Sequence, residues 1–170
     1  MKTKVCLLML YFFARHCFGH ESYQYGENIV HGPFNNPIIK DSKIYFSKSQ
    51  DSNYPVYLVL EKRDATPLVV DQYPISGSDP YVVSAFFFPV KEEDNLFVIL
   101  RWELNNRGLG TYGDLYEIHA YHYIDGKLSI NKFITSNPDM NGMDGYIEGV
   151  QSIFKLKTAS DVKAYIKKNL

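Results

Sequence analysis

The spacing of apolar and polar residues beyond position 42 predicts a succession of short β-strands. Apolar positions there alternate with polar ones or form short runs, and Gly, Pro, Asn and Asp separate the segments. The segment 81–90 is apolar at odd and even positions alike, which is typical of a central strand covered on both faces. Asp125 and Gly126 form a strong signal for a tight hairpin turn. The predicted strands are 43–48, 56–62, 68–73, 81–90, 96–104, 115–124, 128–134 and 146–156.

The remaining segments predict an irregular arm, two glycine-containing loops and one helix. Residues 20–42 carry many turn-forming residues, and 105–114 and 137–145 are predicted as loops. Thr158 and Asp161 are typical of a helix start, and the apolar residues that follow have helical spacing. Because no internal repeat or linker is found, a single domain is expected over residues 20–170. The predicted fold class is α+β and mainly β, an antiparallel β-meander or sandwich-like sheet with one C-terminal helix.

Residues 1–19 have the three parts of a secretory signal peptide. Basic residues precede an apolar run over 5–13, and Cys17 and Gly19 supply small residues before a cleavage site. The run is much shorter than the roughly 20 apolar residues that span a bilayer, and His16 before the cysteine is unlike lipoprotein processing. We therefore expect export, cleavage near Gly19 and no stable membrane anchor. A buried N-terminal strand is the alternative.

Charge and cysteine content exclude some classes of protein once this leader is set aside. The leader holds both cysteines and three of the 18 basic residues, which leaves 15 basic against 19 acidic residues. A net acidic chain lacks the positive surface on which nucleic-acid binding depends, so nucleic acid is not an expected partner. Without cysteine, the remaining chain has neither a disulfide nor a thiol nucleophile.

Alternation also assigns the residues of two neighbouring strands to opposite faces. In 96–104 and 115–124, one face is apolar and is expected to join the core, whereas the other carries Arg, Glu, His and Tyr side chains. Tyr and Arg are enriched in protein-binding hot spots. Partner-binding residues are therefore predicted on this second face and in the adjoining loop: Arg101, Arg107, Tyr112, His119, Tyr121 and Tyr123. The alternative is that the helix or the N-terminal arm covers this face.

Two glycine-rich motifs resemble ligand-binding loops but lack features that those loops require. Residues 108–113 match G-x-G-x-x-G, but a strand follows them where phosphate binding needs a helix N-terminus. Residues 139–145 resemble a calcium loop, but Met143 and Val150 fall where an EF-hand needs oxygen ligands. A looser calcium site and a simple turn both stay open for this second motif.

Catalytic motifs are scarce in the sequence. The patterns H-E-x-x-H and G-x-S-x-G do not occur, and His119 and His122 fall on opposite faces of their predicted strand. No catalytic residue, metal ligand or cofactor is therefore assigned, and a binding protein is favoured over an enzyme. The alternative function is a small periplasmic hydrolase or carbohydrate-binding domain that uses Glu103, Glu117 and His119.

Three stretches carry a resemblance to a group of exported proteins. They are residues 84–103, with Ser-Ala-Phe-Phe-Phe and Leu-Phe-Val-Ile-Leu-Arg-Trp-Glu; residues 116–128, with Tyr-Glu-Ile-His-Ala-Tyr-His-Tyr; and residues 157–166. Their order resembles small exported proteins of Gram-negative bacteria without assigned activity, some of which act as periplasmic immunity proteins beside interbacterial toxins. The resemblance implies no particular functional residue. The resulting hypothesis is a periplasmic protein that binds another protein, a toxin or hydrolase, and blocks it.

Overall fold

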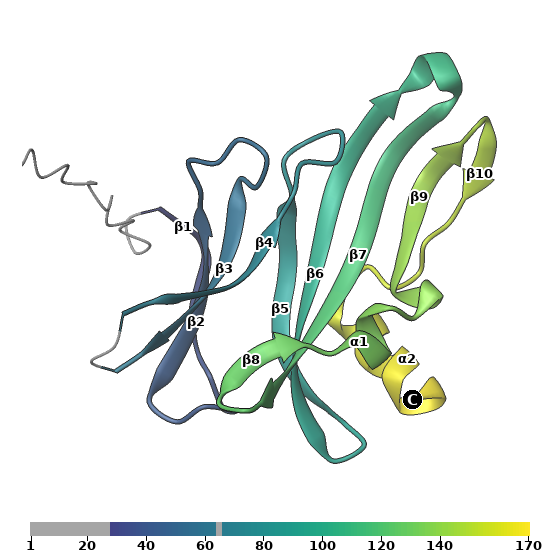
Figure 1. The fold of residues 1–170 in the computed structure, drawn as a ribbon. Helices are drawn as coiled ribbons and strands as arrows, with labels where there is room; N and C mark the ends of the chain where they lie inside the picture. Colours follow the sequence, from purple (N-terminus) through teal and green to yellow (C-terminus); the bar gives the residue numbers. More distant parts are fainter. Residues whose placement is uncertain (1–27, 64–65) are drawn as a thin grey trace, which may run out of the picture.

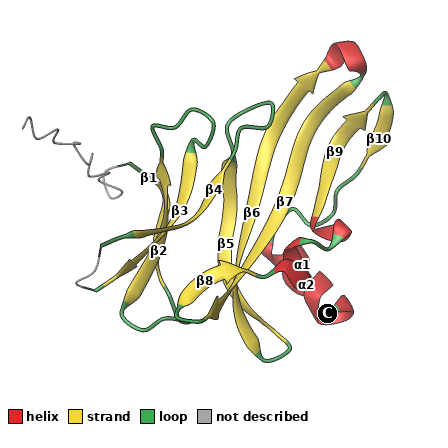
Figure 2. Cartoon of the chain, in the orientation of Figure 1, coloured by secondary structure: helices red, strands yellow, loops and turns green. Residues whose placement is uncertain are grey.

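The computed structural model describes residues 28–63 and 66–170, and the predicted signal peptide at 1–19 lies outside the described residues. Within that range the chain forms two antiparallel β-sheets with a few helices, as Figure 1 and Figure 2 show. The predicted class, α+β and mainly β with a C-terminal helix, is confirmed. No helix in the described part of the chain is long and apolar enough to cross a membrane.

The first sheet has the order β1-β2-β3-β4, and the second has the order β10-β9-β7-β6-β5 with β8 paired to β7. The strands of the first sheet are β1 (Ile29–Asn35), β2 (Ser42–Lys48), β3 (Val56–Lys62) and β4 (Leu68–Tyr73). Those of the second are β5 (Tyr81–Val90), β6 (Glu93–Asn106), β7 (Thr111–Ile124), β8 (Lys127–Ile130), β9 (Asn141–Ile147) and β10 (Val150–Ser152). The helices are α1 (Lys132–Thr135) and α2 (Ala159–Asn169), and single 3₁₀ turns occupy Arg107–Leu109 and Pro138–Met140.

The main core lies between the two sheets. Ile44 and Leu58 of the first sheet belong to one buried cluster with Leu96, Val98 and Leu100 of β6, and all five side chains are excluded from solvent. Trp102 closes one end of this core, because its indole N–H donates to the carbonyl of Pro74 at 2.8 Å and so fastens the loop between β4 and β5. Burial of large aliphatic side chains on this scale is the main stabilising term of such a fold.

A second core lies on the opposite face of the six-stranded sheet, where α2 packs. Val162 and Ile166 of this helix are buried in one cluster with Phe97, Ile99 and Ile118. The helix begins as predicted: the Thr158 hydroxyl accepts from the Asp161 N–H, and the Asp161 carboxylate accepts from the Thr158 N–H. The expectation that only one face of 96–104 joins the core is wrong for its first half, because both faces are covered there.

The pairing of β6 with β7 differs from the predicted arrangement of faces. Val98 lies opposite His119 and Leu96 lies opposite Tyr121, whereas Arg101 lies opposite Tyr116. Because opposed residues of an antiparallel pair project from the same face, Arg101 stands on the other face from His119 and Tyr121. Alternation gives the two faces of each strand, but the register between strands decides which faces coincide.

Several boundaries also differ from the sequence prediction. The expected loop 105–114 is mostly strand, since β6 continues to Asn106 and β7 starts at Thr111. The expected loop 137–145 is a 3₁₀ turn followed by β9, and the end of the expected strand 128–134 is the helix α1. The irregular arm contains β1. Glycines explain the two loop errors, because Gly113 and Gly145 lie inside strands that approach closely.

Gly113 of β7 lies directly opposite Gly145 of β9, and a substitution there should separate these strands. A Cβ atom on Gly113 would stand 2.5 Å from the carbonyl oxygen of Asp144, and its φ of +128° disfavours any other residue. We expect Gly113→Ala to lower the free energy of unfolding by about 2–3 kcal/mol in urea denaturation. Gly108→Ala is the control, because a Cβ there meets nothing closer than 4.0 Å and should change stability by less than about 0.5 kcal/mol. Equal effects of the two variants would contradict this account.

Candidate functional site

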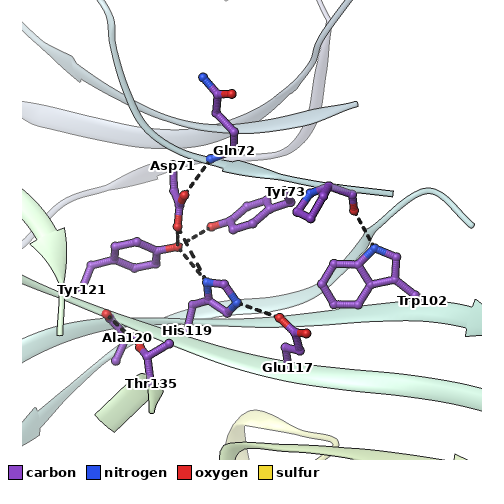
Figure 3. A network of polar contacts seen from close by, with 10 residues as sticks. Asp71, Gln72, Tyr73, Trp102, Glu117, His119, Ala120, Tyr121 and Thr135 are labelled. Atoms are coloured by element: carbon purple, nitrogen blue, oxygen red, sulfur yellow. Dashed lines mark hydrogen bonds and ion pairs between the residues drawn. The ribbon is translucent and has the colours of Figure 1, made fainter. Parts of the chain in front are cut away.

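His119 and Tyr121, two of the predicted partner-binding residues, lie in a polar network between the sheets (Figure 3). The Tyr121 hydroxyl donates to Asp71 Oδ2 of β4 at 2.5 Å and lies 2.9 Å from the Tyr73 hydroxyl. Because Tyr121 gives its proton to Asp71, Tyr73 is the donor between the two hydroxyls. Tyr73 and Tyr121 are at most 1% exposed. The network therefore connects β4 of one sheet to β7 of the other inside the protein.

His119 stands between two carboxylates in the same network. Its Nε2 is 3.1 Å from Glu117 Oε2, and its Nδ1 is 3.7 Å from Asp71 Oδ2 and 3.4 Å from the Tyr121 hydroxyl. Burial lowers the pKa of His119, but the contacts with Asp71 and Glu117 outweigh it and raise this pKa to about 9. The imidazole is therefore protonated at neutral pH, with a hydrogen on each ring nitrogen.

Burial and neighbouring groups also shift the pKa values of Asp71 and Tyr121. Burial raises the pKa of the Asp71 carboxyl, but hydrogen bonds from His119, Tyr121 and the Gln72 N–H outweigh it and leave this pKa below its ordinary value. Burial raises the pKa of the Tyr121 hydroxyl well above its ordinary value, and the nearby Asp71 charge adds to the effect. The folded state thus holds a carboxylate, an imidazolium and neutral phenols, which is a satisfied arrangement of donors and acceptors.

The catalytic alternative requires Glu103, Glu117 and His119 to lie in one place. Glu103 shares its face with Asp114, on the opposite side of the sheet from Glu117 and His119. The trio Glu103, Glu117 and His119 is therefore not brought together, and the network is best explained as a structural connection between the sheets.

Arg101, Arg107 and Tyr112, the other predicted binding residues of this region, lie on the α2 face of the six-stranded sheet, between the part that the helix covers and the β6–β7 turn. There the tip of the β6–β7 hairpin extends at the upper right of Figure 1, well away from α1 and α2. The register places three rows of side chains on one face of this end. We call this surface the open face and define it by ten residues: Tyr81, Arg101, Glu103, Asn105, Arg107, Tyr112, Asp114, Asp144, Tyr146 and Lys157.

Ring contacts fix the aromatic and basic side chains of the open face. The Tyr112 ring stacks on Tyr146 of β9 with centroids 5.0 Å apart, and the Arg107 guanidinium lies 4.6 Å from the Tyr112 centroid. Nearer the helix, the Arg101 guanidinium lies 5.3 Å from the ring of Tyr81, which is 60% exposed. Such cation–π contacts hold otherwise flexible arginines in one orientation.

Carboxylates occupy the row between these aromatic positions. Glu103 lies opposite Asp114, and Asp114 lies opposite Asp144. Arg101 Nη1 is 3.4 Å from Asp114 Oδ2, and Lys157 Nζ is 2.7 Å from Asp144 Oδ2. Burial is partial for all of these groups, so each ion pair is exposed to solvent and contributes little to stability.

The remaining predicted residue, Tyr123, lies away from both the polar network and the open face. It is 41% exposed and lies at the far end of β7 from Tyr112, roughly 35 Å along an extended strand. The prediction that the six residues form one surface is therefore wrong: Tyr121 is interior, His119 is mostly buried beside it, and Tyr123 is remote. Only Arg101, Arg107 and Tyr112 share a surface, since register and burial separate the others.

Sequence reasoning missed the residues that complete the buried polar network and the open face. Asp71 and Tyr73 come from β4, and Tyr146, Asp144 and Lys157 come from segments that follow β8. Their local sequence carries no signal of a shared site, because the contacts join residues far apart in the chain.

No group of three or more His, Cys, Asp or Glu side chains in the described ranges is arranged to hold a metal ion. In the calcium-like loop, Asp139 accepts from the Tyr165 hydroxyl at 2.7 Å and Asp144 contacts Lys157 instead.

Comparison with known proteins gives no relative for this geometry. No protein-family model matches the sequence, and neither the curated proteins nor the solved structures contain a significant match.

Removal of one hydroxyl tests the structural role of the network. Tyr121→Phe leaves the buried Tyr73 hydroxyl and Asp71 without their shared partner, so we expect a loss of about 1–3 kcal/mol in the free energy of unfolding. Tyr123→Phe removes the same atom from an exposed ring and should have almost no effect. Chemical denaturation measures both values. A Tyr121→Phe protein as stable as the Tyr123→Phe protein would show that the network does not support the fold.

The raised pKa of His119 makes stability dependent on pH. Because the folded protein holds this proton more tightly than the unfolded chain, the contribution is complete below pH 6.5 and is lost as pH rises through about 9. The loss should be at most about 3.5 kcal/mol, at about 1.4 kcal/mol per pKa unit. Denaturation midpoints measured between pH 6 and 10 should fall in the wild type. The decline should be shallower in His119→Gln, and parallel curves would contradict the assignment.

Proposed function

We propose that this chain is exported to the periplasm and there binds another protein through the open face, blocking it as an immunity protein or inhibitor does. One observation carries the proposal: a sheet surface presents tyrosine and arginine side chains that ring contacts already hold in place. Tyrosine and arginine are the residues that most often anchor protein interfaces. The leader-like pattern of residues 1–19 supports the export.

Preorganisation of these side chains favours binding. A free arginine or tyrosine loses rotamer freedom when a partner immobilises it, and that loss weakens the complex. Here Arg107, Tyr112 and Tyr146 are stacked in one row before any partner arrives. A partner that contacts this row therefore meets a rigid aromatic surface, which is the property of a strong anchor.

Exposed apolar side chains extend the surface at its tip. Leu109 is 69% exposed in the turn between β6 and β7, and Val150 is 70% exposed where β10 begins. The two hairpin tips are joined, because the Gly149 N–H donates to the Gly110 carbonyl at 3.0 Å. Large apolar side chains in a joined, projecting tip suit insertion into a cleft. Occlusion of a partner's cleft by this tip is the mechanism we propose.

Photo-crosslinking from position 112 tests this function. The full-length chain, expressed with its own leader, would carry a benzophenone amino acid in place of Tyr112 or, as the control, of the remote Tyr123. We expect one periplasmic protein to crosslink from position 112 and not from position 123. Purified and mixed with the wild-type chain, that protein should lose its activity.

Substitutions measure the contribution of the row to this complex. Tyr112→Ala and Arg107→Ala should each weaken binding by about 2 kcal/mol, because both remove an anchor from the aromatic row. Crosslinking of equal strength from position 123, or unchanged affinity in both alanine variants, would overturn the assignment of the open face.

A further inference from the structure

The row of carboxylates on the open face is costly to the fold itself. Glu103, Asp114 and Asp144 are opposed in succession across three neighbouring strands. Directly opposed side chains of antiparallel strands have their Cβ atoms roughly 5 Å apart, and like charges at that separation destabilise the sheet. Packing therefore gives no reason for three acidic residues in this row.

Neighbouring basic groups compensate only part of this charge. Lys157 makes a close contact with Asp144 at 2.7 Å, whereas Arg101 reaches Asp114 through a single longer contact of 3.4 Å. Glu103 is exposed, and among residues 28–63 and 66–170 its carboxylate has no ion-pair partner. The end of the row formed by Glu103 and Asp114 thus keeps an uncompensated negative charge.

Aromatic side chains flank the row on both sides. Tyr112 and Tyr146 lie two residues along their strands from Asp114 and Asp144, which is a separation of roughly 7 Å. On the other side, Tyr81 and Arg101 occupy the neighbouring row. A position above carboxylates with tyrosine rings on either side favours a long cationic side chain, because its methylene stem packs on one ring and its charge reaches the carboxylates.

We propose that the carboxylate row receives a lysine or arginine side chain of the protein partner, held between Tyr112 and Tyr81 and bound by Glu103 and Asp114. This inference rests on the proposed function, since it states the chemistry that the partner presents to the open face. Charge complementarity supports this inference, because a basic side chain would neutralise the negative charge that Arg101 leaves uncompensated on the pair of Glu103 and Asp114. Formation of the complex would then remove a repulsion present in the free protein.

Selection of random peptides displayed on phage tests the inference even before the partner is identified. The immobilised target is the full-length chain expressed with its own leader, and Tyr112→Ala serves as the counter-target. We expect the peptides that require Tyr112 to be enriched in lysine or arginine. Their affinity should fall about fivefold in Glu103→Gln and with added salt, and should be unchanged in Glu61→Gln, an exposed carboxylate on the first sheet.

The outcomes separate this inference from the proposed function. Peptides that require Tyr112 but lack a basic residue, or bind Glu103→Gln as tightly as wild type, overturn the basic-residue proposal and leave the binding surface standing. If no selected peptide depends on Tyr112, or if the same face selectively retains glycans, both the basic-residue proposal and the proposed function are overturned.

Glu103→Gln should also keep or raise the midpoint of thermal unfolding, since it removes a like-charge pair. A clear loss of stability in this variant would mean that Glu103 has a structural role and would overturn the proposal.

Discussion

The burial of β6 on both faces is the constraint on which the rest of the structure depends. Every residue from Leu96 to Leu100 is excluded from solvent. Such a strand needs two covering layers, and the chain supplies the four-stranded sheet on one side and α2 on the other. Both layers lie over the first half of β6. On the α2 side, the part of β6 from Arg101 onward extends past the helix together with β7, and this extension creates the open face.

Where the two sheets meet at β4 and β7, the core ends in polar groups instead of further apolar side chains. Tyr73, Tyr121, Asp71 and His119 satisfy one another there, and the burial of each is tolerable only because the others are present. A network of this kind allows one alignment of β4 on β7, because a shift of either strand would leave a buried hydroxyl or charge without a partner. The network therefore contributes to the specificity of the fold.

The two ends of β7 consequently have different roles. His119 and Tyr121 connect the two sheets, while Tyr112 and Asp114, near the start of the same strand and on its other face, belong to the open face. A rigid scaffold beneath the open face keeps its tyrosines and arginines in position. The same rigidity holds the carboxylate row together despite its internal repulsion, which fits a surface shaped for recognition.

The sequence by itself determined the strand-rich class, most strand positions and the start of α2, because alternation and helix capping are local properties of the chain. It also identified Arg101, Arg107 and Tyr112 as surface residues. Tertiary structure alone decided that Arg101 and His119 stand on opposite faces, that Tyr121 is buried by β4, and that Gly113 and Gly145 lie within strands. Each of these depends on the register between strands or on contacts between distant segments. A shift of one residue in register exchanges the faces of a strand without any change in its own pattern, so no local signal could have fixed them.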